Sequence, residues 1–174
     1  MKILVLNGSP KINGNTSFLI KNFKTGAENV GHKVEVIQVS GLSIRPCIGC
    51  SYCRNDGNGT CVFKDDMAIV LGKANMADLI VFASPVYYWG FSGQLQSLIS
   101  RFYSVRRPNA KKYALVLTAD SKGAFDSVKT QFNSIVNYFK GDVCGIITSF
   151  GEENKSEEKK KEAFSLGART DIFC

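Results

Sequence analysis

The chain alternates between short segments typical of buried β-strands and longer segments with the apolar spacing of amphipathic helices. The strand-like segments lie at residues 2–6, 33–39, 79–83, 113–117 and 143–148. The helical segments are expected at residues 15–30, 65–74, 95–102, 125–139 and 154–172, the last of them mostly solvated. Because a crossover helix returns the chain to the sheet parallel to the previous strand, this order predicts an α/β protein. Its parallel sheet would be covered by helices on both faces.

The chain length of 174 residues suits one domain, and no linker, repeat or low-complexity stretch divides it. We expect a single domain over residues 1–174, with a cysteine-rich loop at about residues 45–64. The elements match a flavodoxin-like three-layer α/β/α sandwich with a five-stranded parallel sheet in the order 2-1-3-4-5. In such sheets the ligand binds at the carboxyl ends of the strands.

The composition excludes several classes of protein. Hydrophobic residues make up 44% of the chain, too many for a disordered one, and no uncharged apolar run is long enough to span a membrane. The first apolar stretch ends at Leu6, too short for a secretory signal. We therefore expect a cytoplasmic protein with no membrane partner.

His32 is the only histidine, so a hydrolase of the Ser–His or Cys–His type would have to use it. It precedes the second strand and lies far along the sequence from any candidate nucleophile. We interpret it as a solvated loop residue.

The loop at residues 7–17 joins the first strand to the first helix, where free N–H groups and the helix dipole favour an anion. Gly8 and Gly14 allow the backbone to bend, and hydroxyl and lysine side chains can bind phosphate oxygens. The glycines are one residue too far apart for a P-loop, and Pro10 is incompatible with the dinucleotide fingerprint. The pattern predicts a phosphate site; a capped polar loop is the alternative.

Residues 84–91 (SPVYYWGF) place several aromatic side chains directly after the third strand. Aromatic side chains are costly as exposed surface, and Pro85 and Gly90 indicate a loop. The pattern favours a platform for a planar ring at the sheet edge over simple core packing.

These two segments, NGSPKINGNTS and SPVYYWGFSGQLQSLISR, resemble the NADPH-dependent FMN reductase branch of the flavodoxin-like flavoproteins over about the first two thirds of the chain. The resemblance implies that the first loop holds the FMN phosphate, the second contacts the ribityl chain and ring, and the loop at residues 118–123 contributes a third contact. The residues expected to bind the cofactor are Ser9, Lys11, Asn13, Asn15, Thr16, Ser17, Pro85, Val86, Tyr87, Tyr88, Trp89, Gly90 and Thr118.

Cys47, Cys50, Cys53 and Cys61 form a C-x2-C-x2-C-x7-C pattern. Such compact spacing can direct thiolates to one iron–sulfur cluster. Structural zinc is the second interpretation and disulfides the third. With the following DDM, the motif resembles the iron–sulfur flavoproteins, which implies a [4Fe–4S] cluster. We interpret the Asp65–Asp66 pair as helix capping.

The net charge is +7, and no acidic residue occurs between Asp78 and Asp120. The basic residues of this stretch are Arg101, Arg106, Arg107, Lys111 and Lys112. They are interpreted either as solvated helix-end charges or as an attraction for the phosphates of NADPH, within this chain or from a partner subunit. No nucleic-acid motif is present, and we expect no nucleic-acid partner.

Taken with the resemblance, the sequence predicts an FMN-dependent oxidoreductase that takes electrons from NAD(P)H or another donor. The acceptor would be a small molecule or a protein, reached through a [4Fe–4S] cluster if one assembles. The alternatives are a flavin or quinone reductase without a cluster, a flavodoxin-type electron carrier and, less favoured, a zinc-stabilised interaction module. No catalytic side chain is expected, because the cofactor carries the chemistry. The resemblance also implies a homodimer or homotetramer.

Overall fold

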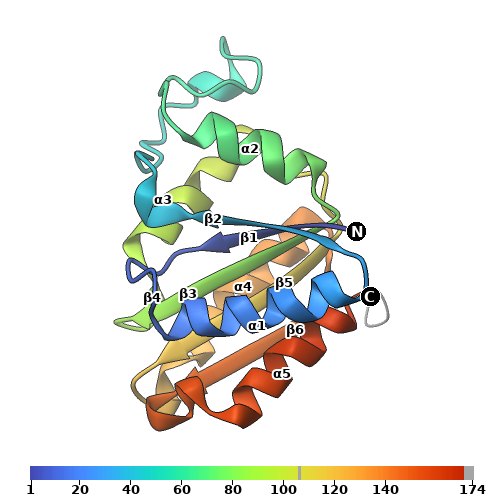
Figure 1. Cartoon of the computed structure of the whole chain (residues 1–174). Coiled ribbons are helices and arrows are strands. Elements are labelled where there is room, and N and C mark those ends of the chain that lie inside the picture. The colour runs from blue at the N-terminus through green and yellow to red at the C-terminus, as the bar shows by residue number, and fades with distance from the viewer. Residues whose placement is uncertain (106, 171–174) are drawn as a thin grey trace.

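The computed structural model describes residues 1–105 and 107–170 (Figure 1). The strands are β1 Lys2–Asn7, β2 Lys33–Gln38, β3 Leu79–Tyr87, β4 Gly90–Phe91, β5 Lys112–Ala119 and β6 Asp142–Phe150. The α-helices are α1 Asn15–Asn29, α2 Met67–Met76, α3 Gly93–Arg101, α4 Asp126–Phe139 and α5 Glu157–Ala168. The expected alternation of strands and helices is therefore confirmed.

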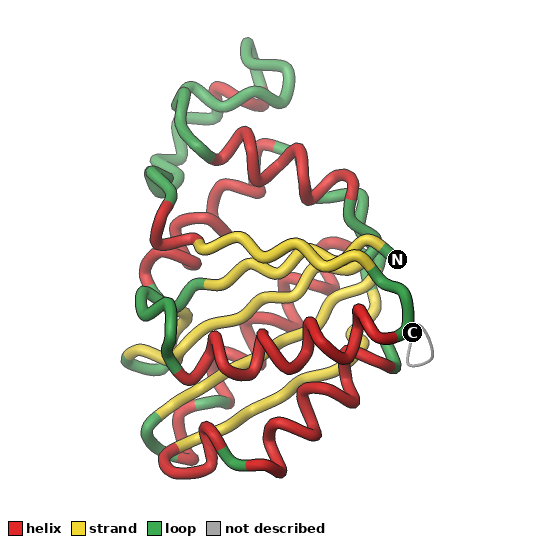
Figure 2. The backbone as a smooth tube through the Cα atoms, viewed as in Figure 1, coloured by secondary structure: helices red, strands yellow, loops and turns green. Residues whose placement is uncertain are grey.

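Five parallel strands form the main sheet in the order β2-β1-β3-β5-β6 (Figure 2). This is the flavodoxin-like arrangement expected from the sequence, but the numbering differs from 2-1-3-4-5. The difference is the two-residue strand β4, which pairs antiparallel with the end of β3. Sequence periodicity cannot detect so short a strand, because it spans a single alternation of side chains.

Two hydrophobic cores lie on opposite faces of the sheet. Along β1, Ile3 and Val5 belong to the core beneath α1 and α5, whereas Leu4 and Leu6 belong to the core beneath α2, α3 and α4. This period of two is the geometry of a strand buried on both faces. Continuous apolar strands thus produce the three layers visible in Figure 1.

The C-terminal helix α5 has a largely exposed outer face, as expected, but its inner face packs closely against α1. A Cβ built on Gly26 of α1 would lie 2.0 Å from the carbonyl oxygen of Phe164. Likewise, a Cβ on Gly167 of α5 would lie 2.0 Å from the carbonyl oxygen of Phe23. The two helix backbones can approach this closely only because glycine occupies both positions.

The interpretation of His32 as solvated is wrong, because only 9% of its surface is exposed. The N–H of Lys33 donates to the carbonyl of Met1, so the starts of β1 and β2 lie side by side. This pairing places His32 Nδ1 3.2 Å from the N-terminal amine. Burial here follows from strand register, which the local sequence does not show.

No helix among residues 1–105 and 107–170 combines the length and apolar character that crossing a membrane requires.

Candidate functional site

A pocket of about 150 Å³ lies where the loop after β1 meets the last residues of β3 and β5, at the carboxyl ends of these strands. Its lining residues are Ser9, Lys11, Gly14, Asn15, Thr16, Pro85, Val86, Tyr87, Thr118, Ala119 and Asp120. Pockets that enclose a whole drug-sized ligand usually measure roughly 300–1,000 Å³. This one can therefore enclose one end of a nucleotide-sized ligand and leaves the rest outside.

The loop between β1 and α1 is fixed by side-chain hydrogen bonds from two strands. The side-chain oxygen of Asn7 accepts from the N–H of Ser9 at 3.0 Å, and its amide donates to Gln38 Oε1 at 2.8 Å. Gln38 Nε2 in turn donates to the carbonyl of Ser9. Asn7 is buried, so its hydrogen bonds are shielded from water. They keep the loop in one conformation without help from a ligand.

Gly8 sits at the closest approach between this loop and α3. A Cβ at this position would lie 2.6 Å from Leu95 Cβ and 2.7 Å from Ser92 Oγ, so no larger residue fits. The hydroxyl of Ser92 donates to the carbonyl of Gly8 at 2.6 Å and accepts from the N–H of Leu95. Ser92 thus caps α3 and holds the loop at once.

The N-terminus of α1 opens into the pocket without a side-chain cap. Its N-cap residue is Gly14, and no side chain accepts a hydrogen bond there. The first N–H groups of a helix need acceptors from outside the helix, and the helix dipole favours a negative charge at the same place. Lys11 and Asn15 line the pocket beside this helix end. The arrangement is suited to a phosphate group.

Thr16 and Thr118 connect two walls of the pocket. Their hydroxyl oxygens lie 2.7 Å apart, and both residues are buried. Each hydroxyl has one proton, so one of the pair donates to the other. The remaining proton and the free lone pairs stay available to a ligand at the pocket wall.

The third wall is the hairpin of β3 and β4, in which Val86 pairs with Phe91 and Tyr87 with Gly90. Tyr87 lines the pocket and is 47% exposed. The two residues of the turn are more exposed still, at 94% for Tyr88 and 59% for Trp89. The hairpin therefore presents uncovered aromatic surface next to the pocket.

The structure brings together most of the residues expected to bind a cofactor. Those that line the pocket are Ser9, Lys11, Asn15, Thr16, Pro85, Val86, Tyr87 and Thr118. The others do not: Asn13 is exposed, Ser17 donates its hydroxyl to the carbonyl of Lys11, and Tyr88, Trp89 and Gly90 form the outer hairpin. Asp120 also lines the pocket, although within the loop at residues 118–123 only Thr118 was expected to bind the cofactor.

The cysteine-rich loop extends beyond α2, away from the sheet (Figures 1 and 2). Cys47 and Cys50 are exposed, Cys53 is buried, and Cys61 lies near enough to Arg101 to interact with its guanidinium. Among the described residues, which include all four cysteines, no three metal-ligating side chains gather into one site. The thiols are suitable donors for a cluster, but this conformation does not assemble them, so the four residues as placed do not fit a [4Fe–4S] cluster.

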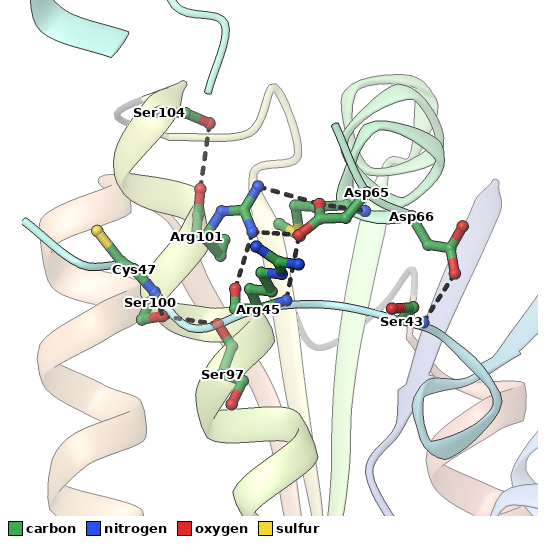
Figure 3. A network of polar contacts seen from close by, with 10 residues as sticks. Ser43, Arg45, Cys47, Asp65, Asp66, Ser97, Ser100, Arg101 and Ser104 are labelled. Atoms are coloured by element: carbon green, nitrogen blue, oxygen red, sulfur yellow. Dashed lines mark hydrogen bonds and ion pairs between the residues drawn. The ribbon is translucent and has the colours of Figure 1, made fainter. Parts of the chain in front are cut away.

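Both ends of this loop are joined at Arg101, the last residue of α3 (Figure 3). Its Nη1 lies 2.6 Å from Asp65 Oδ2, and its Nη2 donates to Asp65 Oδ1 at 3.1 Å. Nη1 also donates to the carbonyl of Arg45 at 2.8 Å. Only 2% of the Arg101 side chain and 10% of the Asp65 side chain are exposed. This is a bidentate pair largely shielded from water.

Burial alone would raise the pKa of the Asp65 carboxyl. Hydrogen bonds from Arg101 and from the N–H groups of Arg45 and Met67 outweigh burial and hold that pKa below its usual range. Burial would likewise lower the pKa of Arg101, but its hydrogen bond and ion pair with Asp65 raise it. Both groups therefore stay charged over the physiological range.

The capping interpretation of the Asp65–Asp66 pair holds only in part. Asp65 Oδ1 accepts from the N–H of Met67 at 3.2 Å, in the first turn of α2. Asp66 Oδ2 instead accepts from the N–H of Ser43 at 2.7 Å and closes the base of the loop.

Neither interpretation of Arg101, as a solvated charge or as an attraction for anions, agrees with its burial.

Arg107, Lys111 and Lys112 do not line the pocket. Lys111 and Lys112 line a cavity with Met1 and Asp78 at the amino ends of the strands. The candidate pocket is at the opposite edge of the sheet, so these lysines cannot bind a ligand in the pocket of their own chain. Arg106 lies outside the described residues.

Comparisons with known proteins give a family model and several relatives that match this chain. The family model for NADPH-dependent FMN reductase matches residues 1–150. An iron-sulfur flavoprotein of Methanocaldococcus jannaschii is 36% identical over 106 residues, which cover 61% of this chain and 54% of that protein. The chain thus spans about half the length of the first curated relatives that it matches.

Solved structures share the fold at low sequence identity. The structure of RosB with a bound 8-demethyl-8-formylriboflavin-5'-phosphate intermediate matches with a TM-score of 0.81 and 16% identity, covering 99% of this chain and 78% of that one. An FMN-dependent NADH-azoreductase from Bacillus anthracis in complex with FMN matches with a TM-score of 0.74 and 14% identity, covering 97% and 99%. At these identities the likeness shows the fold alone.

Proposed function

The chain belongs to the NADPH-dependent FMN reductase family, and from this membership we propose that it binds FMN at the carboxyl-edge pocket and acts as an NAD(P)H-dependent oxidoreductase. The observation that carries the proposal is the uncapped N-terminus of α1, which faces a pocket lined with hydroxyl groups and one lysine. These are the groups that a phosphate monoester requires.

The phosphate end of FMN fits the enclosed part of the pocket. The first N–H groups of α1, the hydroxyls of Ser9 and Thr16 and the ammonium of Lys11 would hold it. Asp120 would lie nearer the uncharged ribityl chain, because a carboxylate accepts hydrogen bonds from hydroxyl groups and repels a phosphate.

The ring end would lie against the hairpin of β3 and β4. Tyr87 lines the pocket where the ring would leave it, and the aromatic surface beyond is exposed. Because Tyr87 and the turn beyond it are exposed in the single chain, a ring lying against them would remain open to water on its other face. A second subunit that covers the ring would complete the site, which supports the homodimer or homotetramer expected from the family resemblance.

The chemistry that FMN would supply when bound is hydride uptake from a nicotinamide and electron transfer to an acceptor. The protein's own part is to bind the phosphate, to fix the ring and to exclude water from one face of it. Among the described residues, no histidine or cysteine lines the pocket. The donor in this proposal is NAD(P)H, and the acceptor is a small molecule such as a quinone or free flavin, or a protein.

The [4Fe–4S] cluster predicted from the four cysteines stays a prediction. It is supported by the motif and by the names of relatives such as the iron-sulfur flavoprotein of Methanocaldococcus jannaschii. The loop conformation described above does not assemble the ligands, so the proposal does not require electron transfer through a cluster.

The test is to titrate the purified protein with FMN and then to follow NADH and NADPH oxidation with a quinone as acceptor. The proposal expects one FMN bound per chain and oxidation that depends on bound FMN. An electron carrier of the flavodoxin type would bind FMN without oxidising the nicotinamide. A colourless protein that takes up zinc and no FMN would contradict the proposal.

A further inference from the structure

The turn between β3 and β4 has a backbone conformation that its residues seldom adopt. Tyr88 and Trp89 both have positive φ angles, of 49° and 60°. Two consecutive left-handed residues suit a two-residue hairpin turn, but Asn-Gly is the usual pair, because side chains larger than that are strained there. Such strain persists only where the surrounding structure holds the backbone in place.

The side chains of the turn do not hold it. Tyr88 is 94% exposed, and Trp89 is 59% exposed. Their rings contact each other edge to face, with centroids 5.4 Å apart, and this contact lies within the turn itself. Most of the support for the turn must therefore come through its backbone.

A hydroxyl from another layer of the fold provides that hold. Ser127, in the first turn of α4, donates a hydrogen bond to the carbonyl oxygen of Trp89. The helix is firmly anchored at this point, because the neighbouring side chains of Val128 and Phe132 are fully buried. Gln131 of α4 also donates to Gln96 of α3 at 2.9 Å, which ties α4 to the helix that follows the hairpin.

We propose that Ser127 is a positioning residue for the flavin site: its hydrogen bond to the Trp89 carbonyl holds the strained Tyr88–Trp89 turn and so fixes Tyr87 at the pocket wall. Ser127 itself does not line the pocket. The inference rests on the proposed function for its consequence, because FMN is the ligand that Tyr87 would contact. The hydrogen bond from Ser127 to the turn is present in the protein without FMN.

Trp89 is the only tryptophan of the chain, so its fluorescence reports on this turn directly. The experiment compares the wild type with Ser127→Ala, with Ser127→Thr, which keeps the hydroxyl, and with Ser134→Ala as a matched control. Ser134 is also an exposed serine of α4, but its hydroxyl donates to the carbonyl of Thr130 within the same helix. Each protein is measured first without FMN and then during an FMN titration.

In the FMN-free protein, Ser127→Ala should lower the fluorescence anisotropy of Trp89 and increase its quenching by acrylamide, because the turn becomes mobile. Ser127→Thr and Ser134→Ala should match the wild type. In the titration, Ser127→Ala should raise the Kd for FMN by about three- to tenfold, the size expected from the loss of one hydrogen bond. The quenching of Trp89 at saturating FMN should also change.

Unchanged Trp89 anisotropy in Ser127→Ala would overturn the inference, as would an equal change in Ser134→Ala or a failure of Ser127→Thr to restore the wild-type values. A mobile turn with an unchanged Kd for FMN would overturn the positioning role at the pocket. A wild type that binds no FMN would instead overturn the proposed function, and the FMN-free anisotropy would still decide whether Ser127 holds the turn.

Discussion

The guanidinium of Arg101 forms two hydrogen bonds with the carboxylate of Asp65, although the two residues lie 36 positions apart and on either side of the helix α2 and strand β3. The same guanidinium binds the carbonyl of Arg45. Arg45 precedes the cysteine motif and Asp65 follows it, so one side chain joins both ends of the cysteine-rich loop to α3 (Figure 3).

Replacing Arg101 should therefore destabilise the protein strongly. The variant Arg101→Met leaves the buried Asp65 carboxylate without its partner, and we expect a loss of about 3–5 kcal/mol in the free energy of unfolding. Lys73→Met is the matched control, because the Lys73–Glu35 ion pair is exposed and should contribute at most about 1 kcal/mol. Denaturant unfolding of both variants checks the difference. Equal losses of unfolding free energy in the two variants would show that the buried pair contributes no more to stability than the exposed one.

The stability of the fold should also depend on pH through Asp65. An unfolded aspartate titrates near pH 4, as its pKa is about 3.9, whereas the folded pKa is lower. As the pH falls through this range, the unfolded state binds a proton first and the folded state loses stability. Asp65→Asn should therefore flatten the fall in unfolding free energy below about pH 4. A slope that matches that of the wild type would assign the acid sensitivity to other carboxylates.

A second pH effect is expected on the alkaline side. Burial raises the pKa of Tyr113 to about 12, and its hydroxyl donates to the carbonyl of Ala110 at 2.9 Å. The unfolded tyrosine ionises near pH 10, so the stability due to this group is intact below about pH 10 and is lost between about pH 10 and 12. Tyr113→Phe should be less stable near pH 7 but should lose less stability over that alkaline range, as measured by urea unfolding at each pH.

The hydroxyl pair of Thr16 and Thr118 should affect both stability and cofactor binding. Replacing either threonine by valine leaves a buried hydroxyl without its partner, at a cost of about 1–3 kcal/mol, while the double variant should cost less than the sum of the two. Thr16→Val should also weaken FMN binding about tenfold. Thr25→Val on the same helix is the control, because Thr25 is exposed and bonds only to Lys21. An additive double variant would show that the two hydroxyls act independently.

The four cysteines of the loop should react with a thiol reagent at different rates in metal-free protein. Cys47 and Cys50 should be alkylated first, Cys61 more slowly, and the buried Cys53 last. Mass spectrometry of peptides after timed exposure to iodoacetamide gives each rate. Anaerobic addition of iron and sulfide should then equalise the protection of all four if a cluster assembles. Uniform protection before any metal is added would mean that the thiols are already gathered.

The sequence predicted the scaffold and much of the pocket because these depend on local patterns. Continuous apolar strands and helical spacing gave the parallel sheet, and the glycine-containing loop placed Ser9 and Thr16 at a helix N-terminus. The same loop pattern located Lys11 in the pocket. In each case the relevant residues lie within one strand–loop–helix unit, where backbone geometry follows from the local sequence.

What the sequence did not reveal depends on contacts between distant segments. In the sequence, Arg101 is a charged residue at the end of a predicted helix. Its guanidinium can be buried only because the fold places the carboxylate of Asp65 beside it. His32 is buried by the register of two strand starts. Ser127 has no motif at all, since its role depends on where a hairpin 38 positions away places one carbonyl oxygen.

The close contact between α1 and α5 has a consequence for how the site is supported. The family match ends at residue 150, before α5 begins, and every pocket-lining residue lies within the matched part. Yet α5 packs backbone to backbone against α1, the helix whose N-terminus lines the pocket. A chain cut after residue 150 would keep every pocket-lining residue but would lose the helix against which α1 packs. The pocket thus depends for part of its support on a helix that contributes no residue to its lining.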